Sequence, residues 1–111
     1  MTVRVALIQL DCSASEAVPA RIERALRLIA EAAAQAQVVV LPELWHCGAF
    51  DFDAARANAE PIDGPTVSAF QRKARELGLV TVINLYERDG ESTYDSSPVI
   101  DADGTLLGVT R

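Results

Sequence analysis

Lysine is almost absent from this chain, whose ten basic residues are nine arginines and a single lysine, Lys73. Sixteen acidic residues outnumber them and give a formal net charge of −6. A chain with this charge is poorly matched to the phosphates of nucleic acids or to an anionic membrane surface. We therefore expect neither a nucleic acid nor a membrane among its partners.

Cysteine and long apolar runs are scarce as well. Cys12 and Cys47 form neither a dense disulfide framework nor a CxxC pair, so a reducing, cytoplasmic setting is expected. No stretch approaches the length of a membrane span, and residues 1–4 lack the features of a signal peptide. The two cysteines and His46 have no recognisable zinc spacing, so we expect no metal and no other cofactor.

The apolar pattern of the first 41 residues predicts a parallel βαβ unit. The short apolar runs 3–10 and 38–41 are typical of strands buried on both faces. Pro19 opens a helical segment between them, which places Arg21 on its polar face. Strand, helix and strand within about 40 residues form the usual right-handed crossover.

The rest of the chain predicts a second helix followed by antiparallel strands. Residues 63–66 signal the helix start, with Pro65 at the first helical position and Gly78 as the C-cap. A third strand is expected over residues 79–85. Hairpin-turn dipeptides at 89–90 and 103–104 then separate strands predicted at 80–87, 93–100 and 105–110. We therefore expect an α/β fold with one mixed sheet over residues 1–111.

Glu43 is the main candidate for chemistry because it follows the buried run 38–41 almost directly. In parallel α/β sheets, ligands bind beyond the carboxyl ends of the strands. A carboxylate at the rim of an apolar sheet is partly desolvated, which raises its proton affinity toward the range of a general base. The alternative is a glutamate that caps a helix or pairs with an arginine.

The sequence of residues 38–45, VVVLPELW, closely resembles the glutamate motif of the nitrilase superfamily of carbon–nitrogen hydrolases. Residues 5–9, the crossover helix, residues 63–66 and the segment 94–104 resemble the same family in the same order and spacing. The resemblance implies that residues 1–111 are the N-terminal, incomplete portion of a carbon–nitrogen hydrolase domain. It also implies a nitrilase-type α-β-β-α sandwich and association into homo-oligomers.

The same resemblance implies a Glu-Lys-Cys mechanism on a small amide, carbamoyl or nitrile substrate. A cysteine thiolate attacks the substrate carbon, Glu43 handles the proton, and a lysine stabilises the oxyanion. The family's lysine comes directly after a run that residues 108–111 match, with Thr110 in the place of tyrosine. That lysine and the later cysteine are not among these 111 residues. The alternative function is therefore a catalytically inactive scaffold or binding protein.

Residues within the chain are poor substitutes for the implied lysine and cysteine. Lys73 lies on the polar side of the second predicted helix, which is typical of a solvated charge. Cys47 follows His46 directly, and neighbouring residues seldom aim their side chains at each other, so a small buried thiol or pocket wall is expected.

The loop 45–52 is expected to form a substrate wall, with Trp45, His46 and Phe50 as the substrate-binding candidates. The alternative, simple packing of this loop, is equally open. Asp95 follows Tyr94 where the family more often has asparagine.

Overall fold

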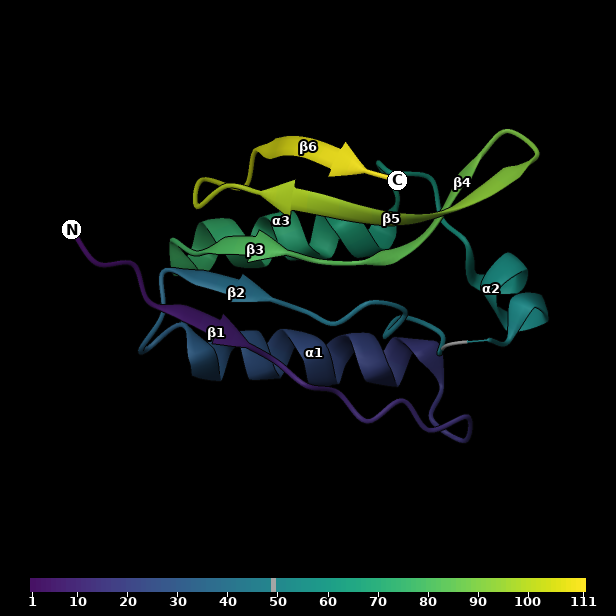
Figure 1. Cartoon of the computed structure of the whole chain (residues 1–111), viewed down its shortest axis with the longest axis horizontal. Coiled ribbons are helices and arrows are strands. Elements are labelled where there is room, and N and C mark those ends of the chain that lie inside the picture. Colours follow the sequence, from purple (N-terminus) through teal and green to yellow (C-terminus); the bar gives the residue numbers. More distant parts are fainter. Residues whose placement is uncertain (49) are drawn as a thin grey trace.

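One mixed sheet forms the body of the molecule, and helices cover one of its faces (Figure 1). The computed structural model describes residues 1–48 and 50–111. Its elements are β1 (Val5–Leu7), α1 (Val18–Ala32), β2 (Val38–Val40), α2 (Phe52–Asn58), α3 (Pro65–Leu77), β3 (Val80–Val82), β4 (Leu85–Asp89), β5 (Ser92–Ile100) and β6 (Leu106–Thr110). The α/β class and the mixed sheet predicted from the sequence are confirmed.

The first half of the sheet is parallel, as the βαβ pattern predicts. Val5 of β1 pairs in register with Val38 of β2, which in turn pairs with Val80 of β3. The two crossovers are made through α1 and α3. The second half is antiparallel, because β5 pairs with β3, β4 and β6 in opposite directions. All three parallel strands therefore point their carboxyl ends toward the same edge.

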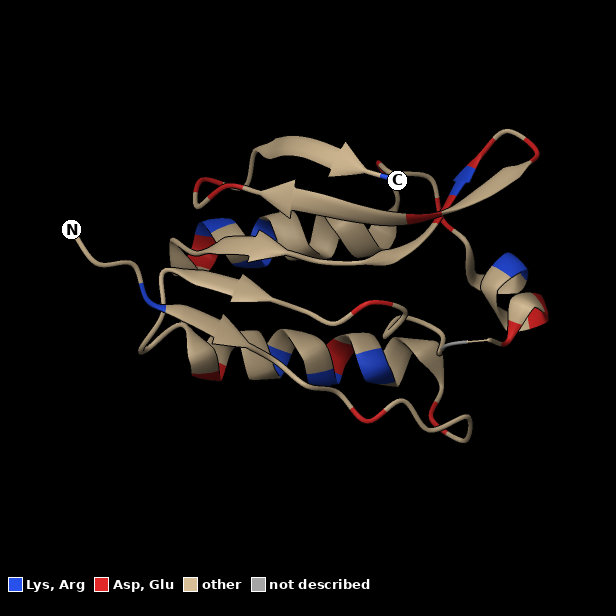
Figure 2. Cartoon of the chain, viewed as in Figure 1, with Lys and Arg blue, Asp and Glu red and all other residues tan. Residues whose placement is uncertain are grey.

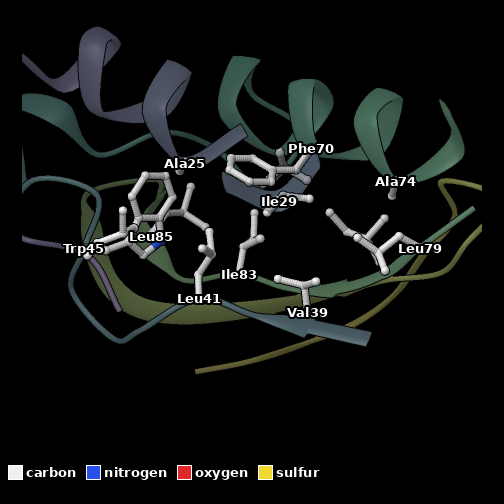
Figure 3. Packing of buried hydrophobic residues seen from close by; sticks show 13 residues of the cluster. Ala25, Ile29, Val39, Leu41, Trp45, Phe70, Ala74, Leu79, Ile83 and Leu85 are labelled. Atoms are coloured by element: carbon white, nitrogen blue, oxygen red, sulfur yellow. The ribbon is translucent and has the colours of Figure 1, made fainter. Parts of the chain in front are cut away.

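The core lies between the sheet and the pair of helices α1 and α3 (Figure 3). Ile29 of α1 and Phe70 of α3 are both 0% exposed and pack against Val39 and Ile83 of the sheet layer. Burying such side chains stabilises the fold by roughly 1.5–3 kcal/mol each. The three- to four-residue spacing of the apolar side chains in α1 and α3 places them on the buried side of each helix.

The opposite face of the sheet is uncovered by the described residues, and this corrects one prediction. Val5 and Leu7 of β1 are 54% and 78% exposed, although the apolar run was expected to be buried on both faces. Side chains alternate along a strand, so one set meets the helices and the other set meets this open face. The prediction was wrong because the apolar run shows that both faces are apolar without showing which residues cover them.

Charged residues gather on the helices, the β4–β5 hairpin and the loops rather than on β1, β2 and β3 (Figure 2).

The position of Arg21 in α1 corrects one prediction. Arg21 was predicted on the polar face, yet it is 2% exposed. Its guanidinium is buried because it pairs with Glu16 and with backbone carbonyls that are described below.

Helix α3 begins at Pro65 and ends before Gly78, as predicted, and Gly78 adopts the left-handed conformation with φ 61°. The short helix α2 was not predicted. Asp51 caps it, because its side chain accepts a hydrogen bond from the backbone N–H of Ala54 at 2.9 Å. The predicted third strand is in fact divided: β3 ends at Val82 and β4 begins at Leu85. No helix among the described residues is both long and apolar enough to cross a membrane.

Both predicted hairpin turns are confirmed, and their glycines offer a matched pair for a stability test. Gly90 and Gly104 both have positive φ, 60° and 88°. A methyl group at Gly90 would meet nothing within 4 Å, whereas one at Gly104 would lie 2.7 Å from the backbone oxygen of Gln71. We expect Gly90→Ala to cost about 1 kcal/mol of unfolding free energy through backbone strain. Gly104→Ala should cost about 1–3 kcal/mol more through the added steric clash.

Urea unfolding of the two variants tests this difference. Equal losses for Gly90→Ala and Gly104→Ala would show that the loop can move away from α3 freely. Such a result would contradict the close packing of this turn against Gln71 and Arg75 of the helix, where Gln71 donates to the Gly104 carbonyl at 3.0 Å.

Candidate active site

Glu43 lies three residues after Val40, the last residue of β2, at the edge of the sheet where the parallel strands end. Its exposed side chain lines a cavity of about 300 Å³. The cavity also receives Asn84 from the β3–β4 junction, Asp95 from β5 and Arg111 beyond β6. Four segments that are distant in sequence therefore meet around one carboxylate. This is the position expected for a ligand site in a parallel sheet.

The neighbouring Asp95 carboxyl raises the pKa of Glu43 above its ordinary value, chiefly through its side-chain interaction with the Glu43 carboxyl. The negative charge of Asp95 and partial desolvation act in the same direction. Two neighbouring carboxyl groups cannot both lose their protons without electrostatic repulsion between the two negative charges. A raised proton affinity was predicted from desolvation alone, whereas in the structure the neighbouring carboxyl is the larger cause.

Asn84 connects the two sides of this cavity. Its Oδ1 accepts a hydrogen bond from the backbone N–H of Leu44 at 2.8 Å. Its Nδ2 donates to Asp95 Oδ1 at 2.7 Å and to Ser97 Oγ at 3.1 Å. The Asn84 side chain itself is only 4% exposed. One buried amide thus ties the turn after Glu43 to strand β5.

The turn after Glu43 is also held from the α1 side. Leu44 has a positive φ of 58°, which is uncommon for a residue with a branched side chain. Arg21 donates from Nη1 to the carbonyls of Trp45 and His46 at 3.2 and 3.4 Å. The same guanidinium pairs through Nε with Glu16 Oε1 at 3.0 Å. A buried arginine therefore satisfies carbonyls that this unusual backbone would otherwise leave unpaired.

Hydrogen bonds from Arg24 and Arg21 lower the pKa of Glu16 from 4.5 to about 2. A lowered pKa means that the contribution of Glu16 to stability is complete above pH 4.5 and is lost as the pH falls through about 2. We expect the thermal unfolding temperature of Glu16→Gln to depend less steeply on pH across this window than that of the wild type.

Differential scanning calorimetry across the same window makes the comparison, with Glu23→Gln as the control. Glu23 is an exposed residue of α1, close in sequence to Glu16, and forms no ion pair among residues 1–48 and 50–111. If Glu16→Gln and Glu23→Gln retained the same acid sensitivity as the wild type, the Glu16 contacts would not stabilise the fold.

Trp45 and His46, predicted on the substrate wall, are placed by the structure in the interior. Both are 0% exposed, and the Trp45 ring meets Phe70 edge-on at 5.8 Å between centroids. His46 Nε2 lies 3.3 Å from Glu60 Oε2. No described cavity is lined by either side chain. Their position supports loop packing, the alternative that the sequence left open.

Glu60 fixes the start of α3 beneath this loop. Its carboxylate accepts hydrogen bonds from the backbone N–H of Thr66 at 2.7 Å and from the Thr66 hydroxyl. Burial acts to raise the pKa of Glu60, but the bonds from His46 and Thr66 outweigh it and leave the pKa below its ordinary value. The sequence analysis did not identify Glu60, because nothing in its spacing distinguishes it from other acidic residues.

Phe50 is 84% exposed, so its ring is free to contact a ligand, and its role as a substrate-binding residue stays a prediction.

Cys47 is buried, and this burial raises the pKa of its thiol to about 11. A thiol with such a pKa is a poor nucleophile near neutral pH. Lys73 Nζ pairs with Glu76 on the surface of α3 at 2.9 Å. Neither residue replaces the implied catalytic cysteine or lysine.

Arg111 is the cation of the cavity, and it is held by three side chains. Its guanidinium contacts Glu87 Oε1 at 2.7 Å and Asp89 Oδ2 at 2.8 Å. It also lies 4.1 Å above the centre of the Tyr94 ring. The hydrogen bond from Arg111 lowers the pKa of Glu87, which is 4% exposed. The charge of Arg111 is therefore largely satisfied within the described part of the chain.

The family model described as carbon-nitrogen hydrolase matches residues 4–111, and the chain belongs to that family.

Curated relatives include an N-carbamoylputrescine amidase from Oryza sativa subsp. japonica, which is 36% identical over 98% of this chain and 37% of its own length. A citrullinase from Francisella tularensis is 32% identical over 98% of this chain and 39% of its own length. The chain thus spans less than two-fifths of these relatives.

Solved structures agree on the fold. A CN-hydrolase superfamily protein from Xanthomonas campestris superposes with a TM-score of 0.80 at 25% identity and covers 95% of this chain and 38% of that one. An N-terminal amidase superposes with a TM-score of 0.82 at 19% identity and covers 98% of this chain and 27% of that one. The nitrilase-type fold predicted from the sequence is confirmed by these neighbours.

Proposed function

We propose that these residues form the N-terminal portion of an enzyme that hydrolyses a small amide, carbamoyl compound or nitrile, with Glu43 as its general base. Membership of the carbon–nitrogen hydrolase family supports the reaction class. The observation that carries the assignment of Glu43 is its place in a cavity past β2, beside a carboxyl that raises its pKa. A carboxylate whose pKa moves toward neutrality is a better proton acceptor at physiological pH.

In the proposed reaction, Glu43 accepts the proton of a cysteine thiol as the sulfur attacks the substrate carbon. It returns a proton to the leaving nitrogen, and it later activates the water that releases the acyl group. A lysine donates to the oxyanion of the tetrahedral intermediate. The family resemblance implies that both partners follow Arg111 in the whole protein, since Cys47 and Lys73 are unsuited to these roles.

A second cavity supports a small substrate with an apolar or aromatic part. It has a volume of about 630 Å³ and shares Asp95 with the Glu43 cavity. Its aromatic lining consists of Phe52, Tyr86 and Tyr94. Phe50 lies two residues before Phe52 in the sequence. Cavities of this size with aromatic walls and a few polar groups suit small molecules. Several relatives are named as N-carbamoylputrescine amidases, so carbamoyl compounds are the first class to test.

Two further proposals rest on the family resemblance and on the cysteines. We infer that the protein works in the cytoplasm, which is supported by two cysteines that are both free thiols. We also infer that it forms homo-oligomers, which light scattering of the purified protein tests directly. A monomer at micromolar concentration would contradict the second proposal.

The function is tested on the protein as its natural gene produces it, after its intact mass has been measured. Ammonia release is followed with three substrate sets: N-carbamoyl compounds, small primary amides and nitriles. We expect turnover of at least one set. If no set is hydrolysed, and if the mass shows no residues beyond these 111, the scaffold or binding role becomes the better description.

A further inference from the structure

We propose that Asn84 is a positioning residue for Glu43, which holds the Glu43 turn and the Asp95 carboxyl at a fixed separation so that the two carboxyl groups face each other. The inference rests on the proposed role of Glu43 as general base. The segments that carry the family resemblance do not include position 84. The claim depends on the contacts of one buried side chain.

The geometry of Asn84 uses all of its amide atoms on the two walls of the cavity. Oδ1 accepts from Leu44 N at 2.8 Å, one residue beyond Glu43, while Nδ2 donates to Asp95 Oδ1 at 2.7 Å and to Ser97 Oγ at 3.1 Å. Asn84 is 4% exposed and lies between the short strands β3 and β4. Removing the Asn84 amide would take from the Leu44 N–H the acceptor that it has in this structure and would release the Asp95 carboxyl from the wall of the cavity.

The bond to Asp95 has a chemical consequence as well as a structural one. The Asn84 amide donates from Nδ2 to Asp95 Oδ1 at 2.7 Å and so holds this carboxyl group beside Glu43. That neighbour is the main reason why the pKa of Glu43 is raised. An exposed aspartate without a partner would instead turn toward water. Asn84 therefore links the backbone position of Glu43 to the proton affinity of its carboxyl group.

Other charged and titratable groups lie close enough to contribute. Arg111, beyond β6, lines the same cavity. The pKa of Tyr86 in β4 is raised, chiefly by burial. Smaller contributions come from the nearby acidic groups Cys47, Asp95, Glu43 and Asp51. None of these groups contacts both Glu43 and Asp95 through hydrogen bonds within the described residues. A change at Asn84 should therefore act through Asp95.

The test is a double-mutant cycle read by the titration of Glu43 itself. The full protein is labelled with ¹³C at glutamate side chains, and the Glu43 carboxyl signal is assigned by its loss in Glu43→Gln. We expect Asn84→Ala and Asp95→Asn each to lower the Glu43 midpoint by about one pH unit. We expect the double variant to shift it no further than Asp95→Asn alone, because coupled residues are not additive.

Kinetics provide the second readout wherever the wild type turns over a substrate. Asn84→Ala should lower kcat by about 10–100-fold with a smaller change in KM, as expected for a misplaced catalytic group. The acid limb of its kcat/KM profile should move to lower pH with the Glu43 midpoint. Asn58→Ala is the matched control, since Asn58 is a partly buried asparagine that donates to Ala54 O at 2.8 Å in α2.

An unchanged Glu43 midpoint in a folded Asn84→Ala protein would overturn the inference, and so would fully additive shifts in the double variant. If Asn84→Ala does not fold, Asn84→Ser is measured by the same criteria, because it shortens the side chain beyond reach of Asp95. The titration needs no turnover. Absence of activity in the wild type would therefore count against the proposed hydrolase function alone, and not against the role of Asn84.

Discussion

Replacing Glu43 by glutamine should reduce turnover by on the order of 10²–10⁴-fold, with little change in KM, in the full protein acting on its best substrate. Glutamine keeps the size and the hydrogen-bonding oxygen of glutamate but cannot accept a proton. The cavity around it would retain the contacts of Asn84 with Leu44 and Asp95, which do not involve the Glu43 side chain. The loss should therefore appear in kcat.

Steady-state ammonia release and circular dichroism of the same preparations check this expectation. Glu31→Gln is the control, because Glu31 is an exposed glutamate of α1 and lies outside the cavity. Activity of Glu43→Gln within a few-fold of the wild type would remove Glu43 from the mechanism. An equal loss in both variants would point to an effect of surface charge instead.

The second large effect concerns the fold. Trp45→Ala should lower the free energy of unfolding by about 3–5 kcal/mol, the range for deleting a large aromatic side chain from a packed core. Trp45 is 0% exposed, and its ring meets both Phe70 and His46 edge-on, at 5.8 and 5.7 Å between centroids. Its removal would leave a cavity beneath the turn that carries Glu43.

Urea unfolding followed by far-ultraviolet circular dichroism measures this loss. Phe52→Ala provides the comparison, because Phe52 is 64% exposed at the start of α2 and its removal should change stability by only about 0.5 kcal/mol. Similar losses in both variants would mean that Trp45 is not part of the core. Such a result would favour the predicted role of Trp45 in the substrate wall.

The fold could be predicted largely because the apolar residues repeat with the periods of helices and strands. Helix α3 shows this best, since Pro65 and Gly78 mark its two ends in the sequence and in the structure. Helix α2 escaped prediction because its seven residues are too few for a periodic pattern. The exposure of Val5 and Leu7 escaped it because periodicity cannot show what covers a face.

A site residue could be proposed from the sequence only where a polar residue follows a strand within a recognisable motif. Glu43 met both conditions. Asn84 met the first, since it follows the apolar run after Gly78, and a polar residue at the end of a parallel strand was a usable signal. Arg21 gave the opposite signal, because helical spacing placed it among solvated arginines. Its burial depends on the carbonyls of Trp45 and His46, which only the folded loop presents.

Successive side chains of strand β5 point to opposite faces of the sheet, where they meet different partners. This alternation limits the registers in which β5 can pair during folding. Asp95 lines the Glu43 cavity, whereas the next residue, Ser96, is 0% exposed and donates to Glu87 Oε2 at 2.6 Å on the other face. A slip of one residue would exchange the two faces and set the Asp95 carboxylate against that of Glu87. Repulsion between the two negative charges would destabilise the shifted register, and the native pairing of the β4–β5 hairpin would be favoured.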